Sequence, residues 1–382
     1  MKLSCKTLDF LQALQLVSRA ISGQQALPIL GNVLLEAEGK RCVVSATDLE
    51  LSIITSFPAQ IENEGSITVP AKAILNFAQY NSDDEVLLET SEGTQLRCTS
   101  KHAKTLIAGE AASEYPTISP IEKETEFTLQ ASPFLEALQK VTFASARTTL
   151  RPVLSGVHIH VDKEKFILVA TDSYRLSEYT LNVDVGGAEI SCIVPTKVLE
   201  ELKTILGGRR EEDDEETGKK SKLGAGISVA LSAHQIEICI GQTRLLSRLI
   251  DGKFPDYQQI IPREEKVHVK LKNKEFTTAV KRMHYFAKEI NNNLTFSVSK
   301  KGVHITTPPT QTGRDETTLQ GEVSGGETKI ALSSSYLLDF LGHVDGDTVD
   351  IHLIDSMHPA VFRLPSNNKY LHLIMPLRIQ EE

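Results

Sequence analysis

Two short segments place an aspartate in the same setting, and they are the first candidates for chemistry. "SATDLELSI" begins at residue 45 and "VATDSYRLS" at residue 169. Acid/base catalysis needs a second titratable group in reach, and neither Asp48 nor Asp172 has a carboxylate or histidine at a position matched in both copies. A Thr-Asp pair that ends a strand ties the following turn through side-chain hydrogen bonds. We interpret both aspartates as turn residues, with a hydrolase that uses them as the competing hypothesis.

Histidine and cysteine give little support for a metal or a nucleophile. His158 and His160 lie two apart and would share one face of a strand, but no third ligand accompanies them. The five cysteines are odd in number and far apart, which is typical of small buried side chains. No GxxxxGK[ST], HExxH, GxSxG or GxGxxG motif occurs. We expect no catalytic residue, no metal and no cofactor.

Basic side chains on the expected helices are the remaining functional signal. The formal net charge of -9 excludes a surface that is basic throughout, yet it allows a local basic lining. If equivalent helices face one way, their charges would attract phosphate backbones without reading bases. The alternative is that these are ordinary solvated helix faces. The candidates for facing DNA are Lys72, Lys140, Arg147, Lys197, Lys203, Lys281 and Arg282.

The elements that carry these residues recur three times along the chain. The first copy contains "LPILGNVLLEAEGKRCVVSATDLELSI", the second "RPVLSGVHIHVDKEKFILVATDSYRLSEY", and a fainter third "NLTFSVSKKGVHITT". Each copy opens with a helix, and the first of these has an apolar stripe of Phe10, Leu14, Val17 and Ile21. Second helices are expected to begin near Pro70, Pro195 and Ser333. Strands with period-two alternation dominate the rest.

This pattern predicts an α+β chain with helices on one face of antiparallel sheets. A length of 382 residues favours several domains, with boundaries expected near residues 124 and 263. The segment 207–226 combines glycine with a run of charges, so we expect a charged surface loop there. No run of about 18 apolar residues and no signal-peptide core is present, which predicts a soluble cytoplasmic protein.

Several short segments of this sequence closely resemble one protein family. "LPILGNVLLE", "RPVLSGV", "ATDSYRLS", "DGKFPDYQQIIP" and "IMPLRI" are similar, in order and from end to end, to the bacterial DNA polymerase III beta subunit, the replicative sliding clamp. The resemblance implies three similar clamp domains, at 1–124, 125–263 and 264–382, with helices lining a central hole and sheets outside. Two chains would close head to tail into a homodimeric ring. That ring would encircle double-stranded DNA without reading its sequence and would have no catalysis of its own.

The same resemblance implies a cleft that holds short linear peptides of clients such as the polymerase catalytic subunit and the clamp loader. Its deep apolar part would be Leu154, Thr171, Leu176, Pro255, Ile260, Leu373, Met375 and Pro376. Its shallower part would be Arg151, Ser173, Tyr174, Arg175, Ser333, Tyr336, Met357 and Leu377. Without the resemblance, the leucines would be interpreted as plain core residues.

Some positions depart from the family pattern. Ser173-Tyr174 stands where family members often have Gly-His. Gln258-Gln259 stands where family members often have an arginine after "FPDY". The cleft rim is therefore expected to prefer different peptides. Gln24 stands where a basic residue that contacts DNA is often found. For the dimer interface we predict Ile107 against Tyr285 and Phe286. A monomeric peptide-binding scaffold that never closes on DNA is the third hypothesis.

Overall fold

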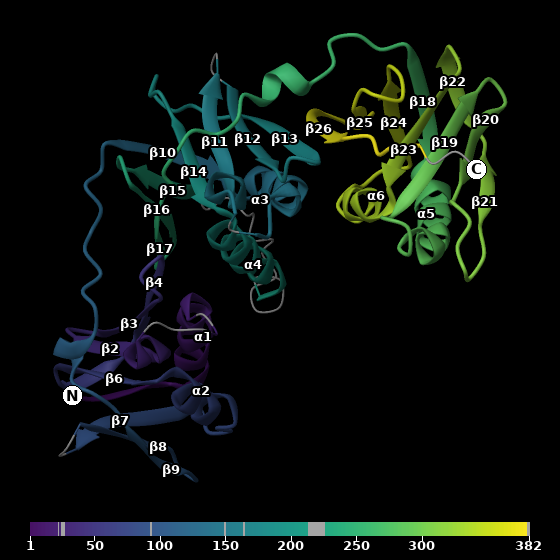
Figure 1. Ribbon diagram of the computed structural model, residues 1–382. Helices are drawn as coiled ribbons and strands as arrows, with labels where there is room; N and C mark the ends of the chain where they lie inside the picture. Colours follow the sequence, from purple (N-terminus) through teal and green to yellow (C-terminus); the bar gives the residue numbers. More distant parts are fainter. Residues whose placement is uncertain are drawn as a thin grey trace. The chain divides into compact units, whose positions relative to one another are not determined.

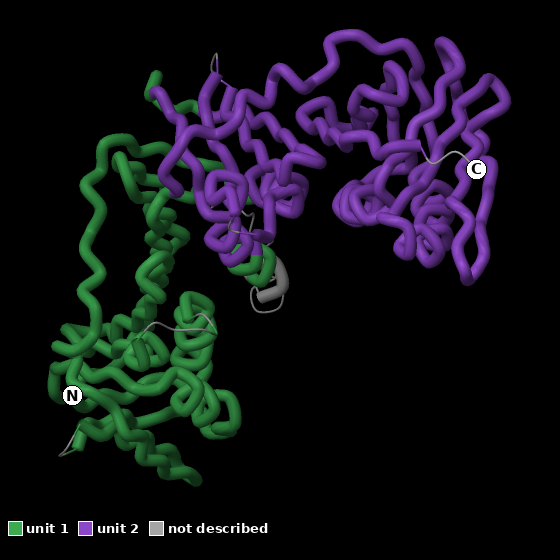
Figure 2. The backbone as a smooth tube through the Cα atoms, in the orientation of Figure 1, with its two compact units in different colours: residues 1–131, 184–188, 204–249 green, residues 132–183, 189–203, 250–382 purple. Residues whose placement is uncertain are grey.

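The chain folds into two compact units (Figure 2). Unit 1 comprises residues 1–131, 184–188 and 204–249, and unit 2 comprises residues 132–183, 189–203 and 250–382. The computed structural model describes residues 1–21, 23, 27–91, 94–148, 150–162, 165–212 and 226–379. Gln24 therefore lies outside the described residues.

Unit 1 is built on two antiparallel sheets, ordered β5-β1-β7-β8-β9 and β10-β15-β16-β17-β4-β3-β2-β6. Helix α1 packs against α2 and against strands β3 and β4. The helices are α1 (Thr7–Val17) and α2 (Ala71–Gln79). The strands are β1 (Lys2–Lys6), β2 (Asn32–Glu38), β3 (Arg41–Thr47), β4 (Leu51–Pro58), β5 (Gln60–Asn63), β6 (Gly65–Pro70), β7 (Glu85–Ser91), β8 (Gln95–Thr99), β9 (Lys104–Ala108), β10 (Thr125–Gln130), β15 (Gly226–Leu231), β16 (Gln235–Ile240) and β17 (Thr243–Arg248).

Unit 2 has a nine-stranded sheet, ordered β14-β11-β12-β13-β26-β25-β24-β18-β22, and a four-stranded sheet, ordered β21-β20-β19-β23. Helices α5 and α6 lie side by side (Figure 1). The helices that begin in or beside this unit are α3 (Ala131–Val141), α4 (Thr196–Glu212), α5 (Asn273–Ala287) and α6 (Ser334–Leu341). The strands are β11 (Gly156–Asp162), β12 (Lys165–Thr171), β13 (Arg175–Asn182), β14 (Ser191–Pro195), β18 (Val267–Lys272), β19 (Asn293–Ser299), β20 (Gly302–Thr306), β21 (Glu316–Leu319), β22 (Gly321–Gly325), β23 (Thr328–Ser333), β24 (Thr348–Leu353), β25 (Ala360–Leu364) and β26 (Asn367–Ile374).

Helix starts agree with the expectations from sequence. Helices α2, α4 and α6 each begin directly after Pro70, Pro195 and Ser333. Ser333 caps α6, because its hydroxyl accepts a hydrogen bond from the backbone N–H of Tyr336. Phe10, Leu14 and Val17 of the first stripe are fully buried on α1. The α+β architecture of antiparallel sheets and helices is confirmed.

Two of the sheets run across the sequence repeats rather than within them. Strand β17 of the second repeat pairs with β4 of the first, with Arg244 opposite Ile54. Strand β13 of the second repeat pairs with β26 of the third, with Leu176 opposite Leu373. Period-two patterns locate strands but do not specify which strand lies beside them, so this joining was not predicted.

The first part of the expected charged loop is helical. Helix α4 continues through Glu212, so the prediction of loop structure for residues 207–212 is wrong. Residues 213–225 of that segment lie outside the described residues, and β15 begins at Gly226. Charged side chains are compatible with an exposed helix, so a charge run alone does not mark where a helix ends.

All five cysteine thiols are free. Cys5, Cys42 and Cys98 are buried, and burial raises the pKa of the Cys42 and Cys98 thiols to about 12. They therefore behave as small apolar side chains. Among the described residues, no helix is long and apolar enough to cross a membrane.

Candidate functional site

The two Thr-Asp segments form equivalent turns. Asp48 accepts hydrogen bonds from the backbone N–H groups of Glu50 (3.1 Å) and Leu51 (2.8 Å). Asp172 accepts them from Tyr174 (2.9 Å) and Arg175 (3.0 Å). Both aspartates are thus engaged in holding backbone. The interpretation as turn residues is confirmed.

Backbone geometry explains why each turn needs this support. Leu49 and Ser173, the residues after each aspartate, have φ angles of 75° and 79°, in the left-handed region that disfavours residues with a Cβ atom. In each turn the threonine hydroxyl accepts a hydrogen bond from the N–H of that strained residue, at 3.0 Å from Leu49 and 3.1 Å from Ser173. The hydrogen bonds that the threonine and aspartate side chains accept offset the conformational cost of the left-handed φ angle.

Arg175 connects the second turn to helix α6. It is only 5% exposed, and its Nε lies 3.0 Å from Asp172 Oδ2 while Nη1 lies 2.5 Å from Asp339 Oδ2. Its guanidinium also lies 4.7 Å from the centroid of the Tyr336 ring. A buried guanidinium is stable only when its charge and donors are satisfied. Arg175 therefore fixes Tyr336 beside the turn, rather than presenting its own charge to a ligand.

An apolar cluster lies next to this turn. Three predicted cleft residues, Leu154, Leu176 and Leu373, are buried together, and Met375 packs against them while partly exposed. The backbone N–H of Met375 donates to the carbonyl oxygen of Tyr174 at 2.8 Å. The cluster consists of Leu154, Ile167, Val169, Leu176, Ile193, Phe254, Tyr257, Val361, Leu371 and Leu373; we call it the apolar cluster.

The remaining predicted cleft residues divide by exposure. Thr171 and Ser333 are buried and engaged in the turn and in the α6 cap, and Tyr336, Pro376 and Leu377 are half-buried. Arg151, Ser173, Tyr174, Pro255, Ile260 and Met357 are exposed. Tyr174 and Met357 are 60% and 80% exposed, which is unusual for large apolar side chains.

Sequence reasoning missed the aromatic part of this region. Phe254 and Tyr257 belong to the apolar cluster, and the phrase "KFPDYQQI" contained them. Asp339 was also missed, because its ion pair with Arg175 joins residues far apart in sequence. The available signal was the aromatic pair Phe254 and Tyr257, which flanks Pro255 between two segments with strand patterns.

His158 and His160 share one face of β11, as predicted. Their rings stack with centroids 4.6 Å apart, and His158 also stacks on Phe254 at 4.8 Å. Burial, and then the neighbouring His160, lower the pKa of His158 to about 4. His158 is therefore a neutral, packed ring at pH 7.

The cations predicted to face DNA differ in exposure and in pairing. Lys72 on α2, Lys197 on α4 and Lys281 on α5 are exposed, as is Arg147 in the bend after α3. Arg282 is exposed but makes two hydrogen bonds to Asp315, at 2.8 and 3.2 Å. The half-buried Lys203 lies 2.6 Å from Glu200. Paired charges contribute less to an electrostatic surface than unpaired ones.

The prediction that Lys140 on helix α3 faces DNA does not agree with the burial of this side chain. It is 3% exposed, and its Nζ lies 3.4 Å from both Asp345 Oδ2 and the carbonyl oxygen of His343. A lysine held in this way cannot present its charge to DNA, so its assignment as DNA-facing is wrong. It joins α3 to the loop after α6 instead.

Strand β9 places Ile107 in the core, away from the surface that an interface would use. Ile107 is 5% exposed and packs in the core, whereas the adjacent Leu106 is 54% exposed. Successive side chains on a strand point to opposite faces, so an interface on this side would use Leu106. Tyr285 is 57% exposed and meets Phe286 edge to face, with ring centroids 5.2 Å apart.

Comparison with known proteins gives a consistent match over the chain. Family models of the DNA polymerase III beta subunit match residues 1–119 (N-terminal domain), 128–256 (central domain) and 258–378 (C-terminal domain). The Beta sliding clamp of a Synechocystis species is 27% identical, covering 99% of this chain and 100% of the relative. That of Staphylococcus aureus is 26% identical, covering 99% of both.

Solved structures agree with these matches. A DnaN sliding clamp from Bartonella birtlesii bound to griselimycin is 26% identical, with a TM-score of 0.92 over 99% of this chain and 100% of that one. The DNA polymerase sliding clamp from Bacillus subtilis, 24% identical, has the same fold, with a TM-score of 0.92 over 100% of both chains.

Proposed function

The chain belongs to the DNA polymerase III beta subunit family, and we propose that it is a sliding clamp that encircles duplex DNA and tethers the replicative polymerase. The observation that carries this proposal is the match of all three family domains in consecutive order over nearly the whole chain. A clamp acts by topology: it prevents the polymerase from diffusing away between nucleotide additions. No catalysis by the chain itself is required.

We propose that two chains form a homodimeric ring of six clamp domains, with boundaries near residues 124 and 263. The edge strands of the described sheets include β9 in the five-stranded sheet and β21 in the four-stranded sheet, which we assign to the contact between copies. Unpaired strand edges offer backbone donors and acceptors to another chain. Leu106, Tyr285 and Phe286 would supply apolar contact around them. Such a ring would encircle chromosomal DNA in the cytoplasm.

Lys72, Arg147, Lys197 and Lys281 are our candidates for facing the duplex. Exposed lysines and arginines contact phosphates without sequence information, as sliding requires. The net charge of the whole chain is -9 even with these cations included, so the rest of the surface is acidic and discourages DNA from adhering to it. Weak attraction is sufficient, because ring closure rather than affinity prevents escape.

We propose that the apolar cluster and its exposed rim bind short linear peptides of the polymerase, the clamp loader and other clients. The buried leucines would form the base of the cleft, and Met375 packs against them while partly exposed. Tyr174, Ile260 and Met357 are exposed apolar side chains that we assign to the rim. Methionine accommodates different partners because its side chain is flexible. Ser173 and Tyr174 at the rim give this cleft its own peptide preference.

Retention on circular and linear DNA tests the clamp function. The chain is loaded by a clamp loader on nicked circular DNA, half of which is then linearised, and both samples are gel-filtered at moderate salt. We expect the protein to stay with circles and to leave linear DNA through its ends. Equal retention on both forms would reject encirclement and favour a peptide-binding scaffold.

A further inference from the structure

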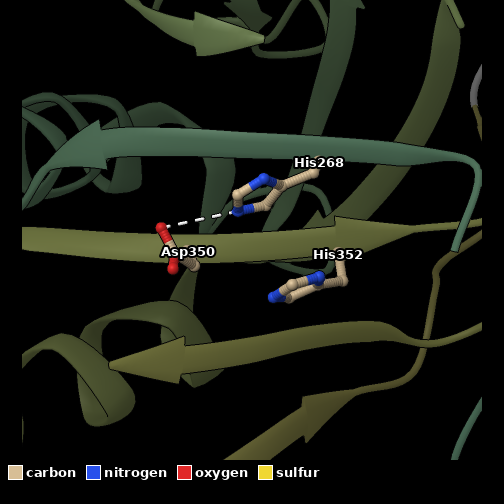
Figure 3. Close-up of side chains that lie close together, drawn as sticks. All are labelled: His268, Asp350 and His352. Carbon is tan, nitrogen blue, oxygen red and sulfur yellow. Dashed lines mark ion pairs between the residues drawn. The ribbon is translucent and has the colours of Figure 1, made fainter. Parts of the chain in front are cut away.

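Two histidines and an aspartate meet on one face of the nine-stranded sheet of unit 2 (Figure 3). His268 lies on β18, and Asp350 and His352 lie two apart on β24. Strand pairing places His268 directly opposite His352. One nitrogen of each histidine and one oxygen of Asp350 all lie within 4.8 Å of one another.

The geometry of His268 and Asp350 fits a shared ion. His268 Nε2 is 3.5 Å from Asp350 Oδ1, and within the described part of the chain both atoms are buried without a hydrogen-bond partner. A direct hydrogen bond would bring nitrogen and oxygen to about 2.9 Å. Two ligands of a tetrahedral zinc ion, each about 2.1 Å from the metal, stand about 3.4 Å apart.

His352 is oriented for the same role. Its Nδ1 contacts the carboxylate of Glu265, which leaves Nε2 as the nitrogen available to a ligand. A carboxylate on the second ring nitrogen fixes the tautomer and orientation of a metal-binding histidine. The rings of His268 and His352 stack with centroids 4.7 Å apart, so both imidazoles lie on the face of the sheet that carries Asp350 (Figure 3).

The surrounding charges set how strongly an ion would bind. Lys270 and Arg363 are in register with Asp350 on the two flanking strands, and their charges oppose the entry of a cation. Asp350 and Glu265 supply the negative charge that counters them. The balance favours a metal with strong affinity for imidazole over one that needs several carboxylates.

We propose that His268, Asp350 and His352 bind one divalent transition-metal ion, best matched by zinc, with water as a fourth ligand. Glu265 positions His352 and is not itself a ligand. The bound ion joins β18 to β24, two strands of the third repeat, and so stabilises that part of the sheet. His352 lies opposite Val361 of the apolar cluster in the pairing of β24 with β25, so the proposed site borders that cluster.

Metal titration of the full chain tests the site. The protein is stripped with a chelator and titrated with Zn²⁺ by calorimetry and with Co²⁺ by visible absorption. We expect one ion per chain, and a loss of at least about tenfold in affinity for His268→Gln, for His352→Gln and for Glu265→Gln. Zinc is also expected to raise the melting temperature of the wild type but not of His268→Gln with His352→Gln.

The stacked pair His158 and His160 provides the matched control. These histidines also lie on a strand, so His158→Gln with His160→Gln should leave stoichiometry and affinity unchanged. Circular dichroism of each variant establishes that it is folded. Absence of Co²⁺ absorption in the wild type, or wild-type affinity in the folded His268→Gln, His352→Gln double variant, would overturn the proposal.

Discussion

Single residues give the two Thr-Asp turns different roles despite their common backbone. Asp48 and Asp172 each accept two backbone hydrogen bonds. Asp172 also accepts one from the guanidinium of Arg175. Through Arg175, which pairs with Asp339, the second turn is part of a charged contact that reaches α6.

Replacing each aspartate by asparagine separates these roles. Asparagine keeps the acceptor for the backbone but removes the charge, so Asp172→Asn should lower the free energy of unfolding by about 1–2 kcal/mol. Asp48→Asn is the matched control and should cost less than about 1 kcal/mol. Urea unfolding followed by circular dichroism measures both. Equal costs would contradict a special role for Asp172.

Buried histidines predict that unit 2 loses stability in acid. Burial, then His160, lower the pKa of His158 to about 4, and burial, then Arg175 and His343, lower that of His372 well below its usual range. An unfolded histidine titrates near 6.5. Between about pH 6.5 and pH 4 the unfolded chain therefore binds more protons, and stability falls as pH falls.

Nuclear magnetic resonance titration of the imidazoles checks this directly. The His158 resonance should move with a midpoint near pH 4, and His158→Gln should flatten the dependence of stability on pH in that range. A midpoint near 6.5 would show that the ring is not desolvated.

Elements differ in how well a sequence predicts them. The starts of α2, α4 and α6 were predictable because proline or serine marks each position locally. The end of α4 was not, and neither was the burial of Lys140, because its partner Asp345 lies in a distant part of the sequence. From periodicity alone, the three cleft leucines would be interpreted as core residues. Only the resemblance of the sequence to the family indicated a peptide-binding site there.

Strand β9 allows the proposed dimer interface to be tested with two adjacent residues, whose side chains point to opposite faces of the sheet. Leu106→Ala should weaken the proposed homodimer with little effect on the melting temperature, since Leu106 is exposed. Ile107→Ala should destabilise the fold by about 2–4 kcal/mol while leaving the exposed surface intact. Light scattering across a concentration series and thermal unfolding measure the two effects. An unchanged dimer in Leu106→Ala would exclude this side of β9.

The whole molecule combines a negative net charge with a few exposed cations on helices. If Lys72, Arg147 and Lys281 contact phosphates, replacing all three by alanine should reduce the salt slope of duplex binding by about 3 for each chain that contacts the duplex. The control replaces Lys40, Lys300 and Lys301, which lie in turns between strands, and should leave the slope unchanged. Fluorescence anisotropy at several salt concentrations measures it. Similar slopes for both variants would reject the assigned face.

The pairing of β13 with β26 limits how this chain can be divided. A cut after residue 263 would remove β26 and leave the backbone groups of Arg175–Tyr179 on an open strand edge, a template for aggregation. Although the three repeats are similar in pattern, none is a free-standing module. Recombination that exchanged one repeat between related genes would also have to preserve the register of its neighbour, so the chain is expected to be inherited as a whole.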